Sequence, residues 1–194
     1  MLFRSLAAAL LASSAFAATV VFDCTKVPNI CSNDCYAIQC IGKPTTLHRD
    51  SENAAYHRNS CDEYPFASSA EGGAGAVTRC VPSRENSVQG GTLSSFYTNN
   101  GVTNGQAYNV GFSNSRGLQY CGTGCKNTGN QVIRSGEQGQ RPGPQFLSRE
   151  FFSNEGHSIL MFERSSEPGS LDHLIGSQVW LAHEERNVTI THVA

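Results

Sequence analysis

The residues best suited to chemistry form a short acidic run in the first half of the chain. Asp62 and Glu63 are adjacent, and Glu71 follows them just ahead of a pair of glycines. Carboxylates at this density need a cation, and such oxygen ligands suit a hard ion, of which Mg²⁺ and Mn²⁺ are the main candidates. Because adjacent side chains alternate across a strand, only one of Asp62 and Glu63 can face that ion directly. The run therefore predicts a site for one divalent metal ion.

A second polar segment comes just before an apolar pattern that is typical of a helix. Leu93, Phe96 and Tyr97 are spaced i, i+3 and i+4, which lines one side of a short helix. Asn86 and Gln89 precede this pattern, and their carboxamide oxygens also suit a hard cation. The alternative for Asn86 is that its side chain simply caps the helix, as Asn commonly does.

Three ordered blocks of the sequence carry a family resemblance. They are Asp62-Glu63-Tyr64-Pro65, Glu71-Gly72-Gly73 and Asn86. In this order and spacing they resemble the secreted deoxyribonucleases of the NucA/NucB type, most closely over residues 57 to 112. The resemblance implies a variant of the ββα-metal nuclease fold, in which two strands and a helix hold one metal ion against the scissile phosphate.

The resemblance also implies a role for each residue of the site. Asp62 becomes the general base, a place that His takes in the wider group of nucleases. Glu71 and Asn86 become the metal ligands, while Glu63 and Gln89 support the site by holding water, metal or phosphate. The alternative is that the carboxylates only keep a strand edge and a turn soluble.

Arginines surround the site in the sequence and could bind phosphates through their planar side chains. Cys61 stands where the resemblance leads us to expect a basic residue, so Arg58 is the expected substitute in catalysis. Arg58, Arg79 and Arg84 are the candidate phosphate-binding residues. The whole chain has a net charge of −2 and 15% charged residues, so its DNA binding would rest on this local positive charge.

The elements that position these residues are short. Segments near 64–67 and 76–82 are expected strands, the glycines of 70–75 form a turn between them, and 92–97 is a helix. Further strands are expected at 107–112, 158–163 and 187–193, and Ser170 could cap a helix over 170–175. These elements predict an α+β fold: a small single domain with a ββα-metal nuclease core and a disulfide-rich N-terminal extension.

The first seventeen residues have the form of a secretory signal peptide. Arg4 supplies the positive charge, residues 6–11 the apolar stretch, and Ala15-Phe16-Ala17 the small residues that a signal peptidase reads. No segment reaches the roughly 20 apolar residues that cross a bilayer. We expect residues 1–17 to be removed, 18–56 to form a cysteine-rich N-terminal region, and 57–194 to form the nuclease domain of a secreted monomer without a membrane or protein partner.

All the cysteines lie beyond the expected cleavage site, and an even number in a secreted chain predicts four disulfides rather than zinc ligation. We expect local pairing within 24–40, a Cys121–Cys125 bridge, and a Cys61–Cys80 bridge across the two expected strands. Asn187 begins the one Asn-x-Ser/Thr sequon, so it is either a glycosylation site or an ordinary strand residue. The eight cysteines are Cys24, Cys31, Cys35, Cys40, Cys61, Cys80, Cys121 and Cys125.

These observations predict a secreted, metal-dependent, sequence-nonspecific endonuclease that hydrolyses DNA and leaves 5′-phosphate ends, with RNA open as a second substrate. One alternative is a cysteine-rich secreted binding module that has the fold without the chemistry. The other is a secreted ribonuclease that works without metal through His57 and Glu63. Dependence of cleavage on metal separates the three.

Overall fold

The computed structural model describes residues 17–52, 61–122, 124–133 and 146–194. In chain order the elements are β1 (Ala18–Asp23), α1 (Pro28–Ile41), β2 (Thr46–His48), β3 (Cys61–Tyr64), β4 (Val77–Cys80), α2 (Ser83–Asn99), β5 (Ala107–Ser113), β6 (Val132–Ile133), β7 (Phe146–Ser153), β8 (Ser158–Arg164), the 3₁₀ helix η1 (Asp172–Leu174), β9 (Gln178–Leu181) and β10 (Arg186–Val193). The expected signal peptide lies almost entirely outside the described residues.

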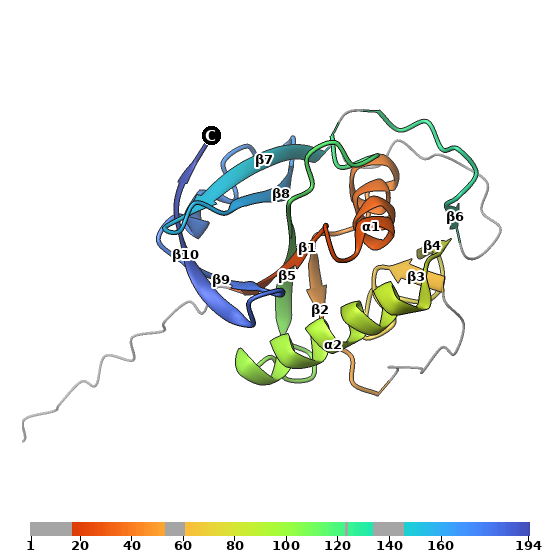
Figure 1. Ribbon diagram of the computed structural model, residues 1–194, viewed down its shortest axis with the longest axis horizontal. Coiled ribbons are helices and arrows are strands. Elements are labelled where there is room, and N and C mark those ends of the chain that lie inside the picture. Colours follow the sequence, from red (N-terminus) through yellow and green to blue (C-terminus); the bar gives the residue numbers. More distant parts are fainter. Residues whose placement is uncertain (1–16, 53–60, 123, 134–145) are drawn as a thin grey trace, which may run out of the picture.

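Six strands of the described chain form a closed barrel. The order around the barrel is β1-β9-β10-β7-β8-β5, and β1 closes it by pairing in parallel with both β5 and β9. The other pairings within the barrel are antiparallel, and β2 adds to β5 outside the closed ring. A separate small sheet has the order β3-β4-β6, and α1 lies between it and the barrel in Figure 1.

The expected fold class is therefore wrong. The described chain is mostly sheet with a closed barrel and two α-helices, not an α+β domain around a ββα-metal core. The predicted local order of strand, turn, strand and helix does occur as β3, β4 and α2, but it lies beside the barrel. Closure depends on pairings between strands far apart in the sequence, which hydrophobic periodicity within a strand does not reveal.

Two apolar clusters hold these parts together. The cluster inside the barrel includes Val21, Phe151, Ile159 and Met161. Gly111 of β5 also belongs to this inner face, where a Cβ atom would lie 3.3 Å from the Met161 sulfur. The absence of a side chain at Gly111 therefore makes room for Met161.

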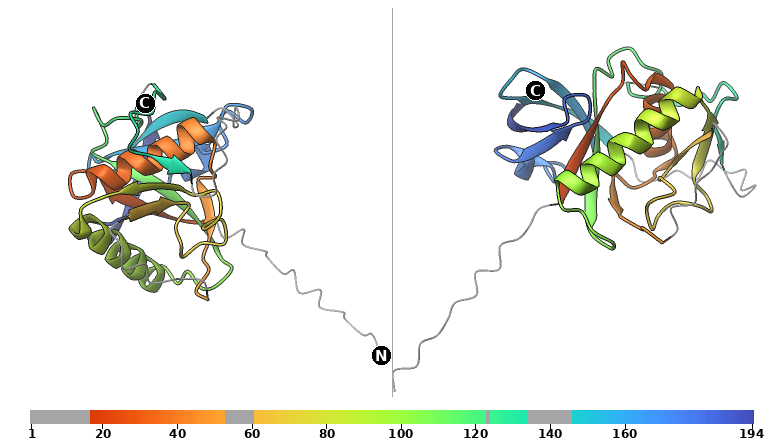
Figure 2. Two further views of the ribbon diagram at one scale, coloured as in Figure 1. Left: turned by 90° about the vertical axis from the view of Figure 1, so that its right-hand side faces the viewer. Right: turned by 60° about the horizontal axis from the view of Figure 1, so that its bottom comes forward.

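The larger cluster joins the outer face of the barrel to both helices and the small sheet. Phe22 of β1, Ile38 of α1, Tyr64 of β3, Phe96 of α2 and Tyr108 of β5 are all buried in it. The right-hand view of Figure 2 shows α2 running along this side of the molecule, from the barrel towards β3 and β4. The segment that carries the first four cysteines contributes to this same core.

Helix α1 occupies a segment for which the sequence predicted turns. Pro28 stands at its first turn, where the missing N–H costs nothing, and Gly42 ends it with a left-handed backbone (φ 81°). Its buried face includes Ile30, Ala37 and Ile38. The buried cysteines of α1 behave as apolar residues. The helical pattern is visible only when they are counted as apolar and not merely as disulfide partners.

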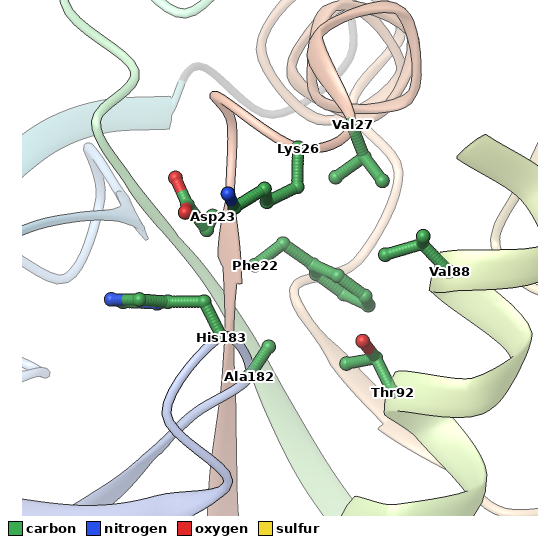
Figure 3. Close-up of a pocket in the computed structure, with 8 residues that line it drawn as sticks. All are labelled: Phe22, Asp23, Lys26, Val27, Val88, Thr92, Ala182 and His183. Carbon is green, nitrogen blue, oxygen red and sulfur yellow. The ribbon is translucent and has the colours of Figure 1, made fainter. Parts of the chain in front are cut away.

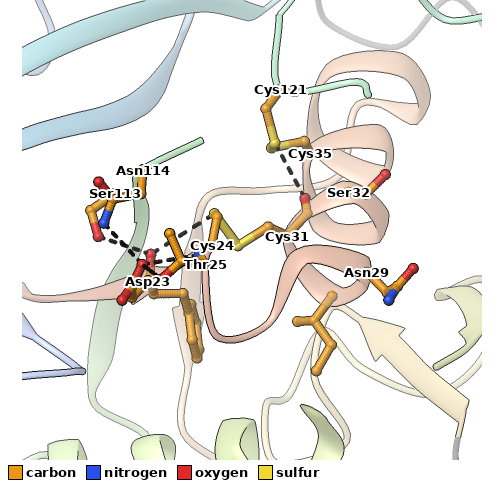
Figure 4. Close-up of a disulfide and its surroundings, with 12 residues drawn as sticks. Asp23, Cys24, Thr25, Asn29, Cys31, Ser32, Cys35, Ser113, Asn114 and Cys121 are labelled. Carbon is orange, nitrogen blue, oxygen red and sulfur yellow. Dashed lines mark hydrogen bonds between the residues drawn. A yellow bond between two sulfur atoms is a disulfide. The ribbon is translucent and has the colours of Figure 1, made fainter. Parts of the chain in front are cut away.

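Three disulfides are present, and each involves α1 or its entrance. Cys24–Cys31 is local as predicted, whereas Cys35 pairs with Cys121 (Figure 4). Cys40 pairs with Cys125, so the expected Cys121–Cys125 bridge is wrong. Spacing alone suggested the short bridge because α1 was not recognised. The helix instead presents its cysteines to a segment about 85 residues downstream.

Cys61 and Cys80 do not form the predicted disulfide in this structure. They are direct cross-strand partners on β3 and β4, as predicted, but both thiols are free and the sulfur atoms lie 3.1 Å apart. Their cross-strand position was therefore predicted correctly, while the bond was not.

Other local predictions had mixed outcomes. The strands expected at 107–112, 158–163 and 187–193 appear as β5, β8 and β10. Ser170 does not cap a helix, because only the 3₁₀ turn η1 forms there and its N-cap is Leu171. Asn187 is exposed on β10, and its glycosylation stays a prediction. Within the described part of the chain, neither α-helix has both the length and the apolar character needed to cross a membrane.

Candidate active site

Asp62 lies at the point where the small sheet meets both helices. Its side chain alternates with that of Glu63 and points towards α1, which leaves it only 2% exposed. The Gln89 side chain of α2 donates a hydrogen bond from Nε2 to Asp62 Oδ1 at 2.8 Å. The Asn33 side chain of α1 donates from Nδ2 to Asp62 Oδ2 at 2.9 Å. One amide from each helix therefore fixes this carboxylate.

A second buried carboxylate, Asp34, accompanies Asp62. Asp34 is fully buried on α1, and no hydrogen-bond donor of the described residues reaches either of its oxygens. It is close enough to Asp62 for a shared proton to link the two groups. Burial, followed by the charge of Asp62, raises the pKa of Asp34 well above its ordinary value. Both carboxyl groups of the pair therefore hold a proton more readily than an exposed Asp does.

The pKa of Asp62 is raised to about 6, mainly because burial disfavours its charged form. The hydrogen bonds from Gln89, Asn33 and Asp34 act in the opposite direction, and the charge of Glu63 raises the pKa further. The result is a carboxylate that is ionised at neutral pH yet accepts a proton more readily than an exposed Asp.

Glu85 joins α2 to the beginning of α1. Its carboxylate accepts hydrogen bonds from the backbone N–H of Asn29 at 2.8 Å and of Ile30 at 3.3 Å, and from the Asn29 side chain at 2.6 Å. A carboxylate at a helix N-terminus is favourable because the first N–H groups have no partner within the helix. Glu85 and Gln89 are one helical turn apart, so the same face of α2 holds both α1 and Asp62.

The predicted site residues are brought together only in part. Asp62 and Gln89 are in contact, and Arg79 is the cross-strand partner of Asp62, with its guanidinium donating to Asn29 Oδ1 at 2.7 Å. Glu63 lies on the opposite face of β3, as the strand alternation predicted. Arg84 is exposed on the first turn of α2. Arg58 lies outside the described residues, as does His57.

The two proposed metal ligands lie on different elements. The backbone N–H of His48 donates to Glu71 Oε2 at 2.9 Å, and His48 Nδ1 lies 2.7 Å from Glu71 Oε1. Asn86 is half-buried inside α2, which begins at Ser83, so the alternative role of a helix cap is wrong. No contact among the described residues joins Glu71 to Asn86 or to Asp62.

The glycines after Glu71 are required by the backbone conformation of the turn. A Cβ atom on Gly72 would lie 2.2 Å from the carbonyl oxygen of Phe66, and Gly73 has a left-handed backbone with φ of 86°. Both positions therefore require glycine for the turn between β3 and β4, which agrees with the interpretation of these glycines as turn residues rather than a phosphate loop.

Sequence reasoning missed Asn33, Asp34 and Glu85. Asn33 and Asp34 lie in the cysteine-rich N-terminal region, which was expected to be separate from the nuclease domain. One feature of the sequence could have indicated them: they are two polar residues between Ile30 and Ile38, in a segment that forms a buried helix. Polar residues inside an apolar helical pattern are informative, because burial of an uncompensated polar group is costly.

The two raised carboxyl pKa values predict how stability changes with pH. Because Asp34 and Asp62 bind protons more tightly in the folded state than in the unfolded state, the stability that this pair contributes is greatest at low pH and falls as pH rises from about 4 through their folded pKa values. Between pH 5 and pH 7 we expect a loss on the order of 1 kcal/mol from Asp62, to which Asp34 adds. In Asp34→Asn the loss should be smaller.

The measurement is urea unfolding at pH 5 and pH 7, followed by circular dichroism. Glu167→Gln, at an exposed carboxylate after β8, serves as the control that should keep the wild-type pH dependence. An identical pH dependence in wild type and Asp34→Asn would contradict the assignment.

Comparison with known proteins finds one family similarity, over the first part of the chain. A family model described as Deoxyribonuclease NucA/NucB matches residues 21–111, which points to a nuclease. The resemblance to the NucA/NucB-type deoxyribonucleases is thereby confirmed over this stretch, which runs from β1 into β5 and contains the whole cluster around Asp62. No curated protein and no solved structure matches the chain.

Proposed function

We propose that this protein is a secreted, metal-dependent endonuclease that hydrolyses the phosphodiester bonds of DNA without sequence specificity. The observation that carries the proposal is the buried Asp62 carboxylate, held by Asn33 and Gln89 inside the region that matches a deoxyribonuclease family. A general base works best when its pKa lies near the working pH, and a pKa of about 6 meets this condition.

Asp62 acts on a water molecule in this proposal. Because only 2% of Asp62 is exposed, its partner is a water that enters beside it rather than the phosphodiester itself. The carboxylate takes a proton from this water as the oxygen attacks phosphorus, the bond from phosphorus to the 3′ oxygen breaks, and the departing 3′ oxygen takes up a proton from solvent. The products are a 5′-phosphate end and a 3′-hydroxyl end.

Asn33, Gln89 and Asp34 position the base. Each amide holds one oxygen of the Asp62 carboxylate, so its orientation stays fixed while its charge changes. Burial and the charge of Asp62 raise the pKa of Asp34, which limits the negative charge of the pair. Together these side chains keep one carboxylate available for proton transfer.

A hard divalent cation is the expected cofactor, with Mg²⁺ and Mn²⁺ as the main candidates. Glu71 and Asn86 offer a carboxylate and a carboxamide oxygen, the donor types that such an ion prefers, although no hydrogen bond among the described residues links the two side chains. We assign Glu71 and Asn86 as ligands, with Glu71 exchanging one of its His48 contacts for the metal. When bound, the ion supplies charge withdrawal from the phosphate and the departing oxygen.

Phosphate contacts account for the lack of sequence specificity. Arg79 beside Asp62 and Arg84 at the exposed start of α2 offer planar cations for backbone phosphates, with Arg58 as a third. Contacts to phosphates carry no base information, so DNA is the main expected substrate with RNA as a second. Three disulfides among the described residues fit a protein of an oxidising compartment, which supports secretion.

Metal dependence tests the proposal. We expect tag-free mature protein to nick plasmid DNA with Mg²⁺ or Mn²⁺ and to lose this activity in excess EDTA. Glu71→Gln should reduce cleavage by at least about tenfold at limiting metal, because it removes a charged ligand. Glu167→Gln is the matched control and should cleave like wild type.

The other outcomes identify the alternatives. Cleavage of RNA that persists in EDTA would favour a metal-independent ribonuclease, with Glu63 and His57 as the pair to substitute. DNA binding without cleavage under any metal would favour the non-catalytic binding module. Either result would overturn the proposed endonuclease.

A further inference from the structure

Three potential metal ligands meet at one end of the barrel, beyond the region that matches the nuclease family. His157 directly precedes β8 in the turn from β7, while His183 and Glu184 lie in the turn from β9 to β10. One nitrogen from each His and one oxygen of Glu184 all lie within 4.8 Å of one another. Two hairpin turns that are separate in the sequence therefore present their side chains to one point.

The distances agree with the ligand shell of a tetrahedral zinc ion. His157 Nε2 lies 3.3 Å from Glu184 Oε1, and His183 Nε2 lies 3.2 Å from the same oxygen. Zinc bonds of roughly 2.0–2.2 Å at tetrahedral angles separate neighbouring ligand atoms by about 3.4 Å. The two imidazole rings meet edge to face, with an interplanar angle of 75°, so they are not stacked.

Neighbouring residues orient the carboxylate towards the histidines. Arg186 pairs with Glu184 through Oε2, the oxygen that does not contact the histidines. The same guanidinium donates to Glu155 Oε1 at 2.6 Å, so its charge is shared between two carboxylates. Glu155 also lies 4.0 Å from His157 Nε2. With neutral histidines, one negative charge remains over the two carboxylates and Arg186, which favours a cation.

The backbone fixes both turns. The backbone N–H of Ser153 donates to the His157 carbonyl at 3.0 Å, and the His157 N–H donates to the Ser153 hydroxyl at 3.1 Å. Before the second pair of ligands, Ala182 donates to the carbonyl of Val21 on β1 at 3.0 Å. Figure 3 shows the imidazole of His183 directed away from Phe22 and the other apolar side chains of the neighbouring pocket. The ligands are thus held before any ion binds.

We propose that His157, His183 and Glu184 form a zinc-binding site with one coordination position open to solvent. The three side chains are 20–25% exposed, so an ion can enter without opening the barrel. Imidazole and carboxylate together suit Zn²⁺, whereas the oxygen donors proposed for the nuclease site suit a harder ion. The two sites therefore bind different classes of metal, and bound zinc ties the β7–β8 and β9–β10 turns together.

The test is zinc binding by tag-free, disulfide-intact protein. Isothermal titration with ZnCl₂ should give one site per chain, and zinc should raise the thermal midpoint. We expect His183→Ala and Glu184→Gln each to weaken zinc binding by at least about 100-fold, since loss of a ligand costs more than loss of its supporting partner. Glu184→Gln keeps the side-chain shape, so its effect does not depend on misfolding.

Two controls separate this site from the rest of the molecule. His173→Ala replaces an exposed His outside the cluster and should bind zinc like wild type. Asp62→Asn should also keep zinc binding, because the nuclease site is separate. Absence of a zinc-dependent heat or thermal shift in wild type at millimolar zinc would overturn the proposal, as would unchanged affinity in both ligand variants.

Discussion

Substitution of Asp62 by Asn should lower the rate of plasmid cleavage by about 10²–10⁴-fold, the range that general bases contribute. Asn has nearly the same shape as Asp but accepts no proton, so the chemical step is affected far more than packing. In Asp62→Asn, the side-chain NH₂ groups of Gln89 and Asn33 face one oxygen and one NH₂ group instead of two oxygens. One of the two hydrogen bonds is therefore lost. Circular dichroism and urea unfolding measure that structural part separately.

Asp34→Asn is the matched control for this substitution. It makes the same chemical change at a carboxyl group that is equally buried and in the same cluster, but that is not the proposed base. We expect Asp34→Asn to lose less cleavage activity than Asp62→Asn, because it alters the surroundings of the base but leaves the base in place. Equal losses in the two variants would show that the carboxyl pair serves folding, and would remove the assignment of Asp62 as base.

The pH profile gives a second readout of the same role. With a pKa of about 6, Asp62 is protonated below that pH and cannot accept a proton, so kcat/KM should fall by about tenfold per pH unit below 6 and level off above it. Residual activity of Asp62→Asn should lack this dependence. A wild-type rate that is constant from pH 5 to pH 7 would contradict the assignment.

The sequence predicted the chemistry of the site better than its surroundings. Asp62 and Gln89 belong to ordered motifs, and local alternation correctly placed Asp62 and Glu63 on opposite faces of one strand. Asn33 and Asp34 come from a segment 28 or more residues earlier. Its cysteines were considered only as disulfide partners, so the helix that carries these two residues was not predicted. Their contact with Asp62 is a product of tertiary packing, which no local pattern encodes.

The same distinction holds for the fold. Strands β5, β8 and β10 were predicted from local alternation, whereas the barrel depends on β1, which pairs in parallel with strands near residues 110 and 180. Parallel pairing between distant segments leaves no turn signal in the sequence. The disulfides follow the fold as well, since Cys35 and Cys40 find their partners only once α1 lies against the segment around 121–125.

Helix α1 supplies Asn33 and Asp34 to the site, and two long-range disulfides fasten it. Cys35–Cys121 and Cys40–Cys125 have sequence separations of 86 and 85 residues. Because they run side by side, either bond alone still closes the long loop. Removing one bond therefore releases only the small ring of about ten residues between them, whereas removing both releases the long loop as well.

Loss of both long-range disulfides should therefore cost far more than loss of one. In the chain-entropy account, replacing Cys35 and Cys121 by Ala lowers the free energy of unfolding by about 2–3 kcal/mol, and replacing all four cysteines lowers it by about 7 kcal/mol. Since a domain is stable by roughly 5–15 kcal/mol, the second variant should be largely unfolded at 37 °C. Urea unfolding of the two variants at 25 °C measures both values.

The local Cys24–Cys31 bond provides the comparison that isolates loop length. Its sequence separation is 7 residues, so Cys24→Ala with Cys31→Ala should cost only about 2 kcal/mol, close to the loss of one long-range bond. If the variant without both long-range bonds were no less stable than this control, the fastening of α1 would not depend on them. If it is much less stable, DNA cleavage should decline with it, because Asn33 and Asp34 reach Asp62 only when α1 is in place.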